Sequence, residues 1–112
     1  MNVLDRFRLD GRKAVITGGS RGLGFEMARA MAEAGAEVVL ASRDLSSAQQ
    51  SAAQLTEAGL KAHAIEADLS TPEKTTDFCQ RVLEAHAPID ILVNNVGGRR
   101  RNNTHEDMPL DT

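Results

Sequence analysis

The chain has 112 residues, 41% of them hydrophobic, and a formal net charge of −3 at pH 7. These values are typical of one compact domain, and the acidic balance argues against a protein that binds the phosphate backbone of nucleic acids. A single cysteine, Cys79, excludes an intrachain disulfide framework, and its residue type fits a small buried hydrophobe in a reducing compartment. Because no apolar stretch approaches the length of a secretory signal or a membrane span, we expect a cytoplasmic protein with small-molecule partners and no membrane partner.

The first half of the chain contains two successive strand and helix units. The apolar runs at residues 13–17 and 37–41 are continuous rather than alternating, which predicts parallel strands buried on both faces. A helix is expected after each run. Gly35 is placed to end the first helix as a left-handed cap, and the second helix is expected to end at Gly59. The buried stripes are predicted to consist of Leu23, Met27, Ala30, Met31 and Ala34 in the first helix and of Leu45, Ala48, Ala52 and Leu55 in the second.

The second half repeats this pattern with weaker signals. Residues 61–67 predict a strand with a single large apolar residue, which suits an edge position. Thr71 is the candidate N-cap of the third helix, and Pro72 takes its first helical position. The buried stripe of this helix is predicted at Phe78, Val82 and Ala85, and residues 89–93 form the fourth strand.

The alternation of strands and helices predicts an α/β fold with a doubly wound parallel sheet. In such sheets a ligand is expected at the carboxyl ends of strands one and four. Residues 108–112 resemble the entry to a further helix, and the fourth strand would be left as a long apolar edge. We therefore expect residues 1–112 to be one segment of a longer protein, with the loop at 98–112 leading to a C-terminal half; a self-contained domain is the alternative.

Three glycines, at positions 18, 22 and 24, lie between the first strand and its helix. Main-chain amides at such a helix start can face a diphosphate, and side chains there would block its close approach. Gly18 permits the tight turn, Gly22 lets the backbone reach a phosphate, and Gly24 lets the helix pack closely on the sheet. The spacing fits neither the general G-x-G-x-x-G fingerprint nor a P-loop. A turn that merely uses glycine is the alternative interpretation.

Three motifs together resemble the short-chain dehydrogenase/reductase family: Thr17-Gly18-x-x-x-Gly22-x-Gly24, then Asp68-Leu69, then Asn94-Asn95-Val96-Gly97. The resemblance covers about residues 9–98. It implies an NAD(P)-binding Rossmann fold and the coenzyme-binding half of a homo-oligomeric oxidoreductase that acts on an alcohol/carbonyl pair. Val96 stands where the family usually has alanine, which predicts slightly different packing near the coenzyme ribose.

The resemblance also implies roles for single residues. Asp68 would accept a hydrogen bond from the adenine amino group, the Leu69 amide would touch the ring, and Asn95 with Gly97 would border the two riboses. From the residues alone, Asp68 could instead cap the loop before Thr71, and the two asparagines could simply tie strand ends together. The predicted coenzyme-binding residues are Gly18, Ser20, Arg21, Gly22, Leu23, Gly24, Arg43, Asp68, Leu69, Asn95 and Gly97.

The end of the second strand predicts which coenzyme is bound. NAD-specific sites place an acid about 20 residues after the glycines, where it binds the ribose 2′-hydroxyl. Here Ser42 is neutral, and Arg43 with Arg21 could form a two-guanidinium clamp for a 2′-phosphate. The sequence therefore predicts NADP rather than NAD. The alternative is that Arg43 pairs with Asp44 or points into solvent.

The sequence contains no tyrosine, whereas the family takes its proton donor from a Tyr-x-x-x-Lys helix. We predict no catalytic residue in this chain and expect a later segment to supply the acid and base groups of an NADP-dependent oxidoreductase. A non-catalytic NADP-binding sensor or interaction module is the alternative, because it would need no tyrosine.

Residues 99–101, all arginine, follow the fourth strand. By family analogy they lie near the mouth of the substrate cleft, where they could attract an anionic substrate such as a sugar acid. A solvated loop is the alternative. The three histidines, His63, His86 and His105, show no metal-ligand spacing, so no metal site is predicted.

Overall fold

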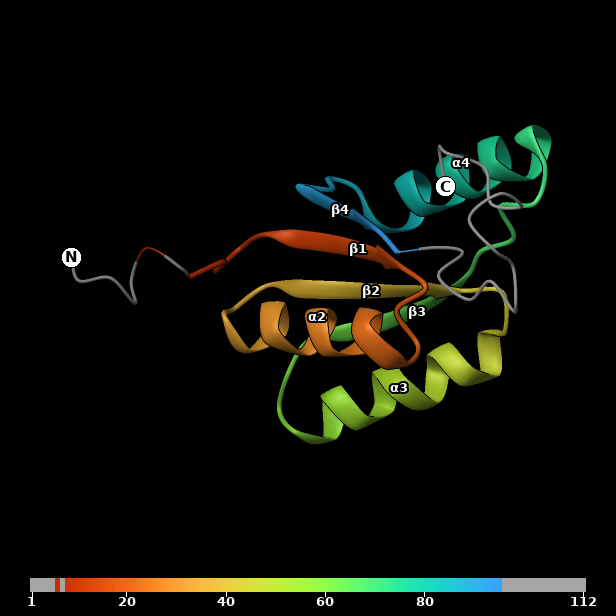
Figure 1. The fold of residues 1–112 in the computed structure, drawn as a ribbon. Helices are drawn as coiled ribbons and strands as arrows, with labels where there is room; N and C mark the ends of the chain where they lie inside the picture. The colour runs from red at the N-terminus through yellow and green to blue at the C-terminus, as the bar shows by residue number, and fades with distance from the viewer. Residues whose placement is uncertain (1–5, 7, 96–112) are drawn as a thin grey trace, which may run out of the picture.

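The computed structural model describes residue 6 and residues 8–95 of the chain. Within them the strands are β1 (Lys13–Thr17), β2 (Glu37–Ser42), β3 (Ala62–Glu66) and β4 (Ile91–Asn94), and the helices are α2 (Gly22–Glu33), α3 (Leu45–Glu57) and α4 (Pro72–His86). The strands form one sheet in the order β3-β2-β1-β4, and every pairing is parallel (Figure 1). The predicted α/β fold with a doubly wound parallel sheet is confirmed.

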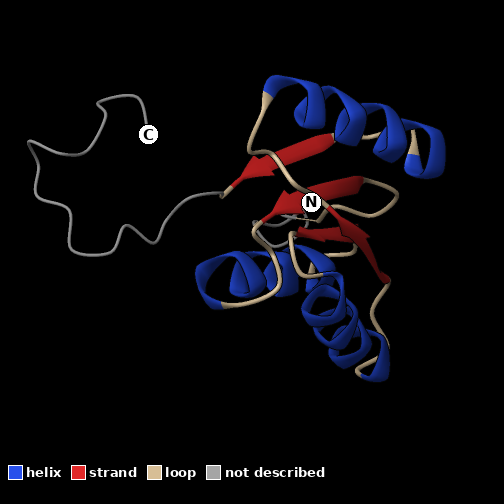
Figure 2. Cartoon of the chain, turned by 90° about the vertical axis from the view of Figure 1, so that its right-hand side faces the viewer, coloured by secondary structure: helices blue, strands red, loops and turns tan. Residues whose placement is uncertain are grey.

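Helices cover both faces of the sheet, with α2 and α3 on one side and α4 on the other (Figure 2). Alternate residues of β1 serve the two layers: Ala14 and Ile16 pack under α2 and α3, and Val15 packs under α4. Both central strands are therefore buried on both faces, which explains why their sequences are continuous apolar runs. The expected edge position of the third strand is also confirmed, since β3 ends the order.

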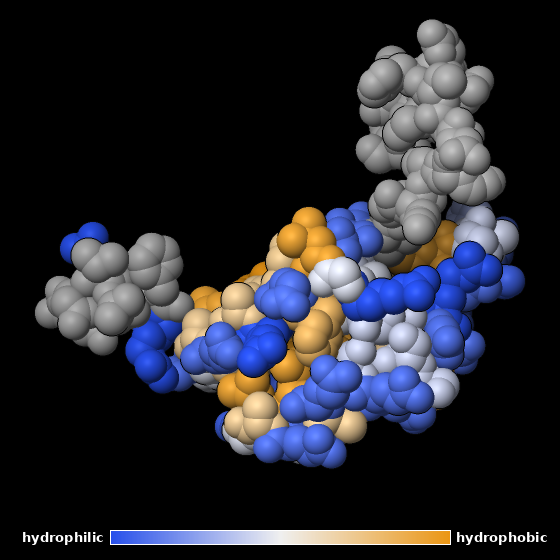
Figure 3. Space-filling model, turned by 60° about the horizontal axis from the view of Figure 1, so that its bottom comes forward, coloured by the Kyte–Doolittle hydropathy of each residue, from blue (hydrophilic) through white to orange (hydrophobic). Residues whose placement is uncertain are grey.

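The buried face of α2 differs from the predicted stripe. Its buried residues are Gly24, Ala28 and Ala32, whereas Leu23 is 69% exposed. The cause is the close approach of α2 to the sheet, since small side chains at four-residue spacing admit the backbone where large ones would not. The prediction from hydrophobic periodicity favoured large apolar residues, and it therefore placed the buried stripe one position before the residues that are in fact buried. Figure 3, viewed from the side of α2 and α3, accordingly shows hydrophobic surface among charged groups.

Helix α4 covers its face of the sheet with a narrow stripe. Phe78 and Val82 are buried as predicted, but Ala85 is exposed. Cys79 is exposed as well, because it follows Phe78 and points about 100° around the helix from it. The expectation of a buried cysteine is therefore wrong. In α3 the predicted Leu45 is also exposed, since it occupies the first helical position.

The strand limits differ slightly from the sequence prediction. Strand β4 begins two residues later than expected, at Ile91, where its register with Ala14 starts. The Asp90 carboxylate accepts a hydrogen bond from the Lys13 amide at 2.9 Å, so a side chain takes the place of a main-chain acceptor at this end of the ladder. Leu92 in β4 is 65% exposed.

None of the described helices has the length and apolar character needed to cross a membrane.

Candidate functional site

The glycine loop lies at the carboxyl ends of β1 and β2. The amide of Gly18 donates a hydrogen bond to the carbonyl of Ala41 at 2.8 Å, which holds the loop against the end of β2. Gly18 has a φ of +67°, in the left-handed region that favours glycine. A Cβ atom at this position would also lie 2.6 Å from the carbonyl oxygen of Asn95, so the turn and its contact with the end of β4 both require glycine.

The other two glycines of the motif differ in their surroundings. A Cβ atom at Gly24 would collide with the carbonyl oxygen of Gly18 and lie 2.7 Å from Nδ2 of Asn95. Gly22 also has a positive φ, +63°, but nothing lies within 4 Å of the place where its Cβ would be. Gly24 is therefore needed for packing, whereas Gly22 leaves open space at the start of α2.

The start of α2 lacks the side-chain cap that the other described helices have. The Asp44 side chain accepts from the amide of Ser47 in α3, and Thr71 accepts from the amide of Lys74 in α4. At α2 the N-cap residue is Arg21, whose side chain makes no capping hydrogen bond, and the first turn contains no acid. The exposed Leu23 belongs to this first turn. The positive end of the α2 dipole and its first amides are thus available to an external anion.

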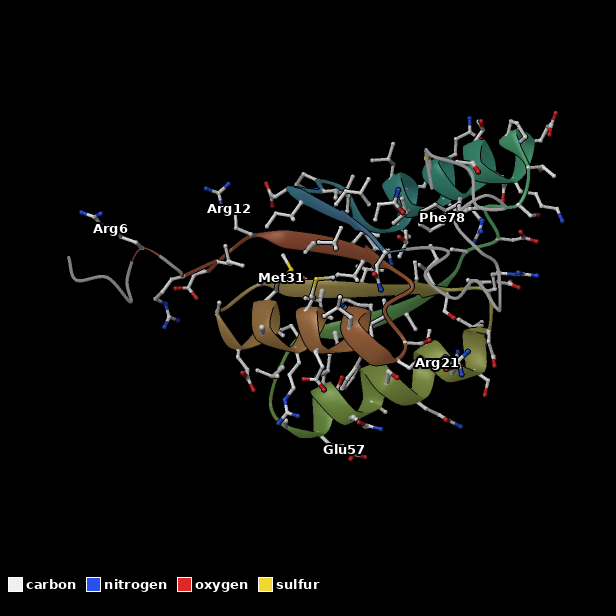
Figure 4. The ribbon with its side chains drawn as sticks, in the orientation of Figure 1. Arg6, Arg12, Arg21, Met31, Glu57 and Phe78 are labelled. Atoms are coloured by element: carbon white, nitrogen blue, oxygen red, sulfur yellow. The ribbon has the colours of Figure 1, made fainter. Side chains whose placement is uncertain are left out.

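Two arginines flank a pair of serines beside this helix start. Ser20 Oγ in the loop and Ser42 Oγ at the end of β2 are 3.4 Å apart. Each serine is followed by an exposed arginine, Arg21 in the first case and Arg43 in the second. Figure 4 shows Arg21 where the loop enters α2, close to α3. The two predicted guanidinium groups are therefore attached to neighbouring points of the backbone.

Neither arginine forms an ion pair within residues 8–95. Asp44, the alternative partner of Arg43, instead accepts a hydrogen bond from the Ser47 amide at 3.3 Å and so caps α3. Two positive charges with no acidic partner in this part of the chain create a local potential that favours a multiply charged anion.

Asp68 follows β3 and stabilises the loop before α4. Its carboxylate accepts hydrogen bonds from the amide of Ser70 at 3.0 Å and from Nζ of Lys74 at 3.1 Å. The bonds from Ser70, and then that from Lys74, lower the pKa of Asp68 to about 2. This is the capping role that the residues alone suggested. The adjacent Leu69 packs partly against the core under α4.

The third motif joins the ends of β1 and β4. Thr17 Oγ1 donates to Oδ1 of Asn94 at 3.1 Å and accepts from the amide of Asn95 at 3.0 Å. The Asn95 side chain approaches the carbonyl of Gly18 at 3.5 Å. The asparagines therefore tie strand ends together, as their alternative interpretation required, and in doing so they bring the third motif against the first. Gly97 and Val96 lie outside the described residues.

The family model for short chain dehydrogenases matches residues 12–111. The chain belongs to the short-chain dehydrogenase family. It is 49% identical over 100 residues to an uncharacterized oxidoreductase of Mycobacterium tuberculosis, a match that covers 89% of this chain and 38% of that protein.

Solved structures agree with this membership. The RhlG/NADP active-site complex of Pseudomonas aeruginosa is 41% identical with a TM-score of 0.78, over 87% of this chain and 38% of that one. A gluconate 5-dehydrogenase of Burkholderia cenocepacia in complex with NADP and tartrate is 37% identical with a TM-score of 0.82, over 98% of this chain and 43% of that one. The chain thus spans less than half the length of these short-chain dehydrogenase relatives.

Within the short-chain dehydrogenase fold, most of the predicted residues lie at the carboxyl edge of the sheet. The predicted coenzyme-binding residues do not include two buried polar residues, Thr17, which begins the first motif, and Ser51. Thr17 had a visible signal, since it is a hydroxyl residue at the end of an apolar strand, whereas Ser51 lies in a polar stretch of α3 and had none. Among the described residues, no group of three or more histidine, cysteine or acidic side chains is arranged to hold a metal ion.

Proposed function

We propose that this chain is the coenzyme-binding half of an NADP-dependent oxidoreductase that interconverts an alcohol and a carbonyl compound. The observation that carries the proposal is the uncapped start of α2, which adjoins two arginines that have no acidic partner among the described residues. A helix start of this kind suits a diphosphate, and a pair of guanidinium groups suits a terminal phosphate monoester. NADP contains both groups, whereas NAD lacks the monoester.

The surroundings of the glycines support a fit to the diphosphate. Gly18 and Gly24 bring the loop, α2 and Asn95 into close contact, and Gly22 faces open space that a side chain would fill. In this proposal the amides of the first turn of α2 bind the diphosphate. Asp68 and the Leu69 amide contact the adenine, while Asn95 and Gly97 border the riboses.

The relatives supply independent support for the coenzyme. Complexes with NADP are known for RhlG, for the gluconate 5-dehydrogenase of Burkholderia cenocepacia and for a 3-oxoacyl (acyl-carrier-protein) reductase of Agrobacterium tumefaciens. A nicotinamide coenzyme, when bound, supplies or accepts the hydride of the reaction. In this proposal the residues of this chain bind and orient the coenzyme and do not supply the tyrosine proton donor, since the chain contains no tyrosine.

Titration of the intact protein with NADP and with NAD tests the proposal. We expect NADP to bind more tightly, and we expect Arg43→Ala to weaken NADP binding about 10- to 100-fold, which corresponds to losing a charged hydrogen bond. The affinity for NAD should change little. Arg29→Ala, which removes an exposed arginine paired with Glu33 in α2, is the matched control. Equal affinity for both coenzymes, or an unchanged preference in Arg43→Ala, would contradict the proposal.

A turnover assay separates the enzyme from an NADP-binding sensor. The intact protein is mixed with NADPH and a panel of carbonyl compounds that includes keto acids, and the decrease in NADPH absorbance is followed. Consumption of NADPH that depends on a carbonyl compound supports the oxidoreductase. Tight binding of NADP without turnover on any member of the panel would favour the sensor.

A further inference from the structure

Ser51 is a buried hydroxyl residue in the middle of α3. It is 7% exposed, and its neighbours in the buried face of α3 are Ala48, Ala52 and Leu55. Burying a serine at such a position is unfavourable unless its hydroxyl has a hydrogen-bond partner. In many helices the partner is the carbonyl four residues earlier, and Thr56 does bond the carbonyl of Ala52 in this way at 2.9 Å.

The Ser51 hydroxyl bonds to a different part of the chain. It donates to the main-chain carbonyl of Ser20, which lies 31 residues earlier in the glycine loop. Ser20 is the residue directly before Arg21. The peptide that carries the Arg21 side chain is thus attached to the core of the protein from the side of α3.

This contact is part of a network of hydrogen bonds that extends to Ser42, the residue before Arg43. Ser20 Oγ lies 3.4 Å from Ser42 Oγ, which in turn accepts from the amide of Asp44 at 3.2 Å. Arg21 and Arg43 directly follow the two serines of this network in the sequence. The relative position of the two guanidinium groups therefore depends on how the Ser20 peptide is held.

The glycine loop has a second, separate attachment on the side of β4. There the Asn95 side chain approaches the carbonyl of Gly18, and Gly24 packs on the same carbonyl. That attachment fixes the part of the loop beside the start of α2. Loss of the Ser51 hydrogen bond would release the part before Arg21 and leave the part at Gly18 in place.

We propose that Ser51 is a positioning residue for coenzyme selectivity, which holds the Ser20 peptide so that Arg21 and Arg43 bind one 2′-phosphate together. The inference rests on the proposed function, because it requires the two arginines to bind that phosphate. It predicts that loss of the Ser51 hydroxyl weakens the binding of NADP and leaves the binding of NAD nearly unchanged.

The test is calorimetric titration of the intact protein with NADP and with NAD. Ser51→Ala should raise the dissociation constant for NADP about 5- to 10-fold, as expected for one lost hydrogen bond, and should change that for NAD less than about 2-fold. Ser46→Ala, at an exposed serine of the same helix, is the control and should change neither constant. An unchanged ratio of the two constants in Ser51→Ala would overturn the inference.

A double-mutant cycle separates positioning from general destabilisation. If Ser51 acts through Arg21, then Ser51→Ala should have no further effect on NADP binding in an Arg21→Ala background. Additive effects would contradict the inference. Should Ser51→Ala fail to fold, Ser51→Cys keeps a side chain of similar size with a weaker donor, and the same selective loss is expected at smaller magnitude.

The same titrations distinguish a failure of the proposed function from a failure of the role of Ser51. If the unmodified protein shows no preference for NADP, the proposed function fails, and the inference fails with it. If the preference exists but Ser51→Ala leaves it intact, the proposed function stands and only the role of Ser51 is wrong.

Discussion

Gly22 and Gly59 share a backbone conformation and differ in location. Both have a positive φ, +63° and +87°, and at neither position would a Cβ atom meet another atom within 4 Å. Gly22 is the first residue of α2 and lies at the candidate site. Gly59 lies just after the C-terminal end of α3. A substitution therefore strains the backbone at both positions but places a methyl group in the candidate coenzyme site at only one of them.

Alanine substitutions at these two glycines distinguish an effect on coenzyme binding from an effect on the stability of the fold. We expect Gly22→Ala and Gly59→Ala each to lower the free energy of unfolding by about 1–2 kcal/mol, the cost of a left-handed conformation for alanine. Only Gly22→Ala should also reduce NADP affinity, because its methyl group occupies the space beside the diphosphate. Urea denaturation and coenzyme titration of both variants measure the two effects. A similar loss of affinity in Gly59→Ala would show that backbone strain alone weakens binding.

The three described helices begin in different ways. Thr71 caps α4 with a hydrogen bond of 3.1 Å to the Lys74 amide, but Arg21 at the start of α2 makes no such bond. Thr71→Ala should therefore lower the free energy of unfolding by about 1 kcal/mol. Arg21→Ala should leave the stability of the free protein nearly unchanged and should weaken NADP binding. Denaturation curves with and without NADP measure both, and a large loss of stability in free Arg21→Ala would mean that α2 depends on this side chain.

Most elements were predictable because their signals are local. The apolar runs of β1 and β2 reflect burial on both faces, and Gly35 follows its helix with a positive φ of +110°, as expected for a left-handed cap. The second helix likewise ends just before Gly59, as expected. The buried face of α2 was not predictable from hydrophobicity, since small size decides it. The hydrogen bonds from Ser51 to Ser20 and from Thr17 to Asn94 join residues 31 and 77 positions apart. Such contacts depend on the packing of whole elements, which no local pattern encodes.

The two ends of the sheet carry different groups of side chains. The carboxyl ends of the strands form the candidate coenzyme site. At the amino ends, Lys13 of β1 lies beside Glu37 of β2, and Glu37 is hydrogen-bonded to His63 of β3. The ring of His86, at the end of α4, lies 5.3 Å from that of His63. Ionisable groups from four elements thus meet away from the candidate coenzyme site.

This cluster makes the stability of the protein depend on pH. Burial, and then the nearby charges of His63 and Lys13, lower the pKa of His86 below its ordinary value of 6.5, although Glu37 acts in the opposite direction. The unfolded chain therefore binds a proton at this position more readily than the folded one. It follows that the contribution of His86 to the free energy of unfolding is present at neutral pH and decreases as pH falls below about 6.5.

We expect His86→Gln to reduce the loss of stability between pH 7 and pH 5, because glutamine does not titrate. Thermal unfolding of both proteins across this range measures the difference, and Arg29→Ala, on the far side of the sheet, is a control that should keep the slope of the unmodified protein. Glu37 does not confuse the result, since its pKa is lowered from 4.5 and its effect falls at more acidic pH. NADP affinity should change with pH by the same amount in both proteins, because the cluster lies at the opposite end of the strands and any titration of the 2′-phosphate, whose second pKa is about 6, is common to both. An identical pH dependence of stability in His86→Gln would show that another group dominates.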